Sequence, residues 1–80
     1  MKVEEVEELA REVAIILDES IPFSPEHIAT VIYRGFQQGL VTKQEALDAL
    51  NCILQSCALD ELLPEWFNKI FTIRQKIYES

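Results

Sequence analysis

Hydrophobic residues recur along this chain at intervals of three and four positions, the spacing that places them on one side of a helix. The pattern divides into four stretches, which predict helices at about residues 3–19, 25–38, 43–58 and 64–78. We therefore expect an all-α fold, a compact four-helix bundle-like domain that spans residues 1–80 and has a helix-turn-helix hairpin at its centre.

The first predicted helix has one apolar side and a beginning rich in glutamate. The residues expected on its apolar side are Val3, Val6, Leu9, Ala10, Val13, Ile16 and Leu17. Acidic residues are favoured near the N-terminus of a helix because the helix dipole places partial positive charge there. Ile15 falls on the acidic side of this helix, and we expect its side chain to be exposed.

The second and third predicted helices carry clear signals at their ends. Ser24 and Pro25 supply a capping serine and a first-turn proline for the second helix. Gly39 can adopt the left-handed conformation that ends a helix. Thr42, followed three residues later by Glu45, matches the reciprocal capping box that begins the third. These signals predict a tight hairpin of two helices.

Gly35 lies in the middle of the apolar side of the second helix. A glycine inside a helix costs about 1 kcal/mol relative to alanine, so we expect a packing reason for it. Close approach of another backbone would be such a reason, and Ala46 and Ala49 offer a matching small surface on the third helix.

The last predicted helix carries the strongest indication of a binding surface, because its apolar residues cover roughly 160° of the helix circumference. They form two stripes, with Arg74 beside them: Trp66, Ile70, Ile73 and Ile77, then Phe67, Phe71 and Tyr78. Either both stripes are core and Arg74 extends to its edge, or the second stripe contacts another chain, since aromatic residues and arginine are enriched at interface centres. The predicted protein-binding residues are Trp66, Phe67, Ile70, Phe71, Arg74, Ile77 and Tyr78.

Composition and charge narrow the choice of partner. The chain has 80 residues, of which 49% are hydrophobic, so it can form one core that is only marginally stable and that favours self-association. The net charge of −7 disfavours nucleic acid and anionic membrane, both of which reward a basic surface. A second copy of the chain, or a basic or apolar protein partner, fits better.

The N-terminal sequence and the length of the apolar runs favour a cytoplasmic location. The first eight residues are acidic where a secretory signal would be basic and then apolar. The longest apolar run, residues 13–17, is far shorter than the roughly 20 residues of a membrane span. We expect a cytoplasmic protein whose thiols stay reduced and which has no membrane partner.

Candidate chemistry is sparse. Cys52 and Cys57 point about 140° apart on one helix, which disfavours a disulfide or a shared metal ion. We expect Cys57 in the core and Cys52 as a partly exposed thiol. His27 has no recognisable nucleophile to serve, which favours a solvated or cap-associated imidazole. The sequence thus predicts no enzyme, no cofactor, no metal and no small-molecule ligand.

The sequence as a whole predicts a small acidic protein-interaction module, acting as a homodimer, an adaptor or an inhibitor. The alternative is a role with nucleic acid, either as an acidic mimic of DNA or as a helix-turn-helix reader. A recognition helix would present Thr42, Lys43, Gln44, Asp48 and Asn51. Only Lys43 among these is basic, so little charge is available for phosphate contacts. An enzyme is a third hypothesis, which no arrangement of residues in the sequence supports.

Overall fold

The computed structural model describes residues 2–56 and 64–80. Four helices make up most of this part: α1 (Val3–Ile16), α2 (Pro25–Gln37), α3 (Lys43–Ser56) and α4 (Pro64–Glu79). The predicted all-α, four-helix bundle-like fold is confirmed. Among the described residues, no helix combines the length and apolar composition that crossing a membrane requires.

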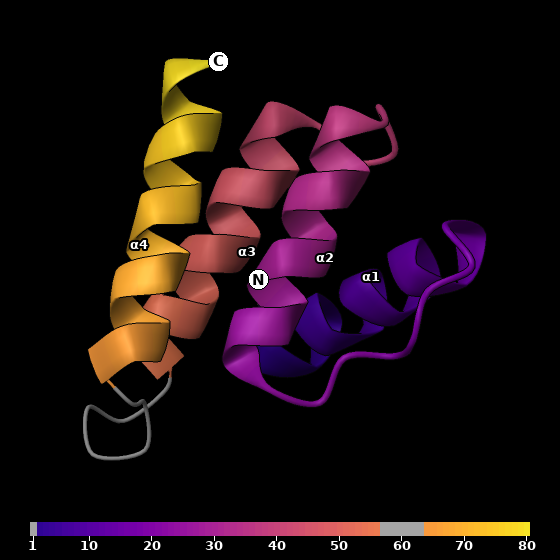
Figure 1. Cartoon of the computed structure of the whole chain (residues 1–80), viewed down its shortest axis with the longest axis horizontal. Helices are drawn as coiled ribbons and strands as arrows, with labels where there is room; N and C mark the ends of the chain where they lie inside the picture. The colour runs from indigo at the N-terminus through magenta and orange to yellow at the C-terminus, as the bar shows by residue number, and fades with distance from the viewer. Residues whose placement is uncertain (1, 57–63) are drawn as a thin grey trace.

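The α2–α3 hairpin forms the centre of the fold. α2 and α3 run side by side in opposite directions, with α4 beside them and α1 lying obliquely at the other side (Figure 1). α1 and α4 each pack against both α2 and α3. Within the described part of the chain, α1 and α4 do not pack against each other. The two outer helices therefore present separate surfaces.

All four helices contribute to one apolar core. Its largest fully buried side chains are Ile32, Leu50, Ile70, Ile77, Val6 and Val31. No charged or polar side chain is buried in residues 2–56 and 64–80, so hydrophobic packing is the main source of stability.

The predicted signals at the ends of α2 and α3 are confirmed. The Ser24 hydroxyl accepts a hydrogen bond from the His27 backbone N–H at 3.2 Å. Gly39 has φ +79°, in the left-handed region. The Thr42 hydroxyl accepts from the Glu45 N–H at 3.1 Å, and the Glu45 carboxylate accepts from the Thr42 N–H at 3.0 Å. These contacts satisfy backbone groups that a helix start would otherwise leave without partners.

The first helix is shorter than predicted. α1 ends at Ile16 and not near residue 19, because Asp18 adopts the left-handed conformation with φ 56°. The apolar side is also turned from its expected position. Ala14 is buried, whereas Ile16 is 64% exposed at the last helical position. Ile15 is exposed as predicted.

The neighbours of Gly35 differ from those expected. A Cβ atom at this position would lie 2.8 Å from Val13 Cγ1 and 3.0 Å from Val41 Cγ2. The prediction that the backbone of the third helix approaches Gly35 is therefore wrong. The glycine instead makes room for side chains of α1 and of the α2–α3 turn. Ala46 and Ala49 are buried in the core but contribute none of the three atoms nearest to that Cβ.

The cysteine predictions have different outcomes. Cys52 is 8% exposed and belongs to the core, so the prediction of a partly exposed thiol is wrong. α1, α2 and α4 all pack against α3, and the periodicity of α3 alone does not reveal how much of its surface they cover. The prediction for Cys57 falls outside the described residues.

Candidate protein-binding surface

The two stripes of α4 have different environments. Ile70, Ile73 and Ile77 are buried in the core of this chain, and Trp66 packs against that core at its edge. Two members of the predicted binding set, Ile70 and Ile77, thus have no surface to offer a partner. Their role in the described fold is to attach α4 to α2 and α3.

The second stripe reaches the surface. Phe71 is 44% exposed and Tyr78 is 68% exposed, while Phe67 is half-buried. The rings of Phe67 and Phe71 stack with their centroids 6.2 Å apart. The four turns of α4 therefore carry an aromatic stripe that the domain leaves partly open to solvent, as the interface hypothesis requires.

Arg74 is held inward by neighbours on both sides. Its guanidinium Cζ lies 4.5 Å from the centroid of the Phe71 ring, within the range of a cation–π contact. Its Nη1 donates a hydrogen bond to Asn51 Oδ1 on α3 at 2.6 Å. Two contacts of this kind fix the guanidinium in place, so little side-chain entropy would be lost when a partner contacts it.

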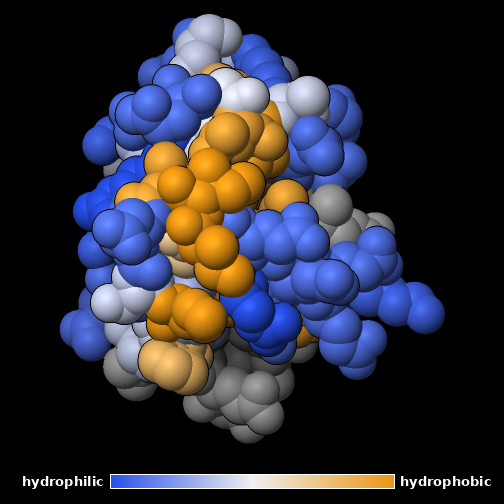
Figure 2. Space-filling model, turned by 90° about the vertical axis from the view of Figure 1, so that its right-hand side faces the viewer, coloured by the Kyte–Doolittle hydropathy of each residue, from blue (hydrophilic) through white to orange (hydrophobic). Residues whose placement is uncertain are grey.

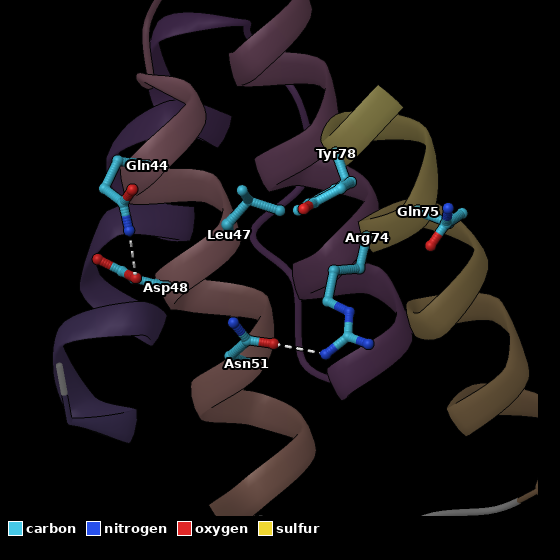
Figure 3. A pocket seen from close by; sticks show the side chains of 7 residues that line it. All are labelled: Gln44, Leu47, Asp48, Asn51, Arg74, Gln75 and Tyr78. Atoms are coloured by element: carbon cyan, nitrogen blue, oxygen red, sulfur yellow. Dashed lines mark hydrogen bonds between the residues drawn. The ribbon is translucent and has the colours of Figure 1, made fainter. Parts of the chain in front are cut away.

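A groove between α3 and α4 runs beside Arg74 (Figure 3). The groove has a volume of about 390 Å³ and is lined by Gln44, Leu47, Asp48, Asn51, Arg74, Gln75 and Tyr78. Gln44 Nε2 donates to Asp48 Oδ1 at 2.8 Å, and Leu47 lies beside the Tyr78 ring (Figure 3). The lining offers amide groups, one guanidinium, one carboxylate and one phenol, which suits contacts with polar side chains of a protein.

The end of α4 is tied to the start of α3. Lys43 Nζ donates to the Ser80 carbonyl oxygen at 2.9 Å and lies 5.9 Å from the centroid of the Tyr78 ring. On the other side of α4, Lys69 forms an ion pair with Glu26 of α2. These surface contacts are individually weak, but together they limit the movement of α4 relative to the hairpin.

One carboxyl group has a shifted pKa, and its cause is structural. The pKa of Glu45 lies below its ordinary value of 4.5, because the Thr42 backbone N–H and then the Thr42 hydroxyl hydrogen-bond to it. Both contacts belong to the capping box of α3. The hydrogen bonds that lower this pKa therefore stabilise the start of α3, and the shift gives no indication of acid–base catalysis.

Neither His27 nor the acidic residues and cysteines of the described chain form a recognisable catalytic or metal site. The His27 backbone N–H is engaged by the Ser24 cap, and its residue is half-buried. In residues 2–56 and 64–80, no group of three His, Cys, Asp or Glu side chains is placed to hold a metal ion.

The residues of the helix-turn-helix alternative are engaged within the chain. Lys43, Gln44 and Asn51 each make a hydrogen bond inside the domain. α2 and α3 also lie side by side and antiparallel (Figure 1), whereas the two helices of a DNA-binding motif cross at a steep angle. The DNA-reading alternative thus gains no support from the geometry.

Sequence reasoning missed one exposed feature. Phe23, in the connection between α1 and α2, is 93% exposed, and Ile21 is 40% exposed. The sequence indicated only a break between helices at this point. A large apolar residue between two prolines, outside any helical pattern, was the available signal.

Comparison with models of protein families, with curated proteins and with solved structures finds no match for this chain. Its function is therefore inferred from its own surfaces.

Proposed function

We propose that this chain functions by binding protein, and that its α4 side binds a second copy of the chain. The observation that carries the proposal is the exposed pair Phe71 and Tyr78 around an arginine that the fold already holds in place. Exposed aromatic residues next to arginine are the composition that interface centres favour.

The groove beside this pair is suited to a two-fold contact. In a two-fold dimer the same patch of each copy meets the other, so a residue and its contact appear twice. Arg74 and Asp48 both line the α3–α4 groove. Each copy can therefore offer its guanidinium to the other copy's carboxylate, while Phe71 and Tyr78 exclude water around the two pairs.

Domain size adds to the argument. A domain of 80 residues buries a limited apolar area, and association of two copies extends that area. Burial of the remaining surface of Phe71 and Tyr78 at the interface would add hydrophobic stabilisation that the isolated domain lacks.

Sedimentation equilibrium tests the proposal. We expect a wild-type dimer at concentrations in the tens of micromolar, a range typical of weak association. Phe71→Ala and Arg74→Glu are each expected to weaken it at least about tenfold, because truncation at an interface centre commonly costs about 2 kcal/mol or more. A wild-type monomer across this range would overturn the homodimer.

Two further variants make the test specific. Lys76→Glu changes charge as Arg74→Glu does, on the same helix but roughly 160° away around its axis, so it should leave the dimer intact. Combining Arg74→Glu with Asp48→Arg reverses the proposed pair and should restore association. Equal weakening by Lys76→Glu would mean that overall charge, and not this surface, controls assembly.

A further inference from the structure

The connection between α1 and α2 forms a second apolar surface, which shares no lining residue with the α3–α4 groove. Figure 2 views the molecule from the side where α1 ends and this connection begins, at the right of Figure 1. A continuous band of apolar side chains crosses that face between hydrophilic flanks (Figure 2). Exposed apolar groups of this extent mark interaction sites more often than isolated ones do.

The surface is hollowed. A groove of about 340 Å³ is lined by Glu7, Arg11, Ile21, Pro22, Phe23 and Ile28. A smaller cavity of about 120 Å³ shares Glu7, Phe23 and Ile28 with it, and its other lining residues are Val3, Val6, Pro25 and Ile53. We call the two together the connection groove. Its floor is apolar and reaches the core, and it stands open to solvent.

Phe23 is presented at the edge of this groove by a stiff backbone. Pro22 precedes it, and Ser24 and Pro25 follow it as the cap and first residue of α2. Proline restricts its own φ and the conformation of the residue before it. The segment around Phe23 therefore loses little backbone freedom on binding, which favours a binding role.

The border of the connection groove on α1 is acidic. Glu7 lines the groove, and Glu4 lies next to it by helical spacing, with Arg11 as the single opposing charge. In the described part of the chain, no glutamate of α1 takes part in an ion pair, because the two pairs present use Glu19 and Glu26. These carboxylates are exposed and available to a cationic partner.

We propose that the connection groove binds a basic amphipathic helix of another protein. Apolar side chains of that helix would pack on Phe23, Ile21 and Ile28, and its lysines or arginines would face Glu4 and Glu7. The negative excess at the border, together with the net charge of −7 of the chain, favours this occupant over an acidic helix or an anionic membrane. This surface is separate from α4, so the proposal holds whether or not the chain forms the homodimer.

The test uses three 16-residue peptides and the full chain. The first places leucine at helical spacing and lysine elsewhere; the second replaces every lysine with glutamate; the third scrambles the first. Binding of fluorescently labelled peptide is followed by anisotropy at low and at physiological salt. We expect the lysine peptide to bind at least tenfold more tightly than either of the others, with affinity falling as salt rises.

Variants locate the binding site. Phe23→Ser should weaken binding at least tenfold, and combined Glu4→Gln and Glu7→Gln should weaken it and flatten its salt dependence. Leu40→Ser, which removes another exposed apolar residue, from the α2–α3 turn, is the control and should leave affinity unchanged. Thermal unfolding verifies that each variant folds; the high exposure of Phe23 predicts that its replacement does.

Other outcomes would overturn the proposal. Equal binding of the lysine and glutamate peptides would show that charge does not select the partner. Loss of peptide binding in Phe71→Ala but not in Phe23→Ser would place the site on α4. Wild-type self-association that Phe23→Ser abolishes would show that a second copy occupies the connection groove.

Discussion

The ends of α1 and α2 adopt the same backbone motif from different sequences. At the end of α1, Asp18 N–H donates to the Ile15 carbonyl at 3.2 Å and Glu19 N–H to the Ala14 carbonyl at 2.8 Å. At the end of α2, the corresponding bonds run from Gly39 to Phe36 at 3.1 Å and from Leu40 to Gly35 at 2.8 Å. Both pairs of bonds form a Schellman motif, with a left-handed residue just after the helix.

The chain does different things after the two motifs. Beyond Gly39, Val41 enters the core and Thr42 begins the capping box of α3, so the turn is part of the packed structure. Beyond Asp18, the chain leaves Ile21 and Phe23 in solvent before Ser24 caps α2. The comparison teaches that a shared way of ending a helix does not decide whether a connection supports the fold or presents a surface.

The largest expected effect on stability concerns Gly35, whose carbonyl accepts a hydrogen bond in the Schellman motif of α2. Gly35→Leu should lower the free energy of unfolding by about 1–3 kcal/mol, because its side chain would displace Val13 and Val41. The better helix propensity of leucine does not offset this overpacking. Chemical denaturation measures the effect, and an unchanged or raised midpoint would contradict it. Val13→Ala should recover part of the stability in the milder Gly35→Ala variant.

Smaller changes in stability are expected at the two left-handed residues, a loss at Gly39 and a gain at Asp18. Gly39→Ala should cost about 1 kcal/mol, because an L-residue is strained at φ +79°. Asp18→Gly should raise stability by up to about 1 kcal/mol, because glycine removes the same strain at φ 56°. Thermal unfolding of both variants checks the pair. Destabilisation by Asp18→Gly would mean that the aspartate side chain supports the end of α1.

The smallest expected effect is the pH dependence of the α3 capping box. The folded pKa of Glu45 is lowered, so its stabilising contribution is complete above the ordinary value of 4.5 and is lost as pH falls through the folded value. Glu45→Gln should remove that part of the acid dependence, leaving the two proteins closest in stability at the lowest pH. Thermal midpoints between about pH 2 and 7 test this expectation; parallel curves would contradict it. The α2 cap should show no such effect, because its third residue is His27 and not a carboxylate.

Local chemistry in the sequence determined most of the helix ends and the α2–α3 hairpin. Ser24, Gly39 and the Thr42–Glu45 pair act through hydrogen bonds that span only three or four residues, so their spacing is enough to predict them. The end of α1 escaped prediction because aspartate is compatible with many conformations besides the left-handed one that Asp18 adopts.

Tertiary packing decided which apolar residues are core and which are surface. Periodicity identified both stripes of α4, yet only contact with α2 and α3 makes Ile70 and Ile77 core and leaves Phe71 and Tyr78 exposed. The burial of Cys52 was likewise set by helices distant in sequence. Helical spacing shows which residues share a side, but burial depends on what that side meets, and that is known only when the whole chain is folded.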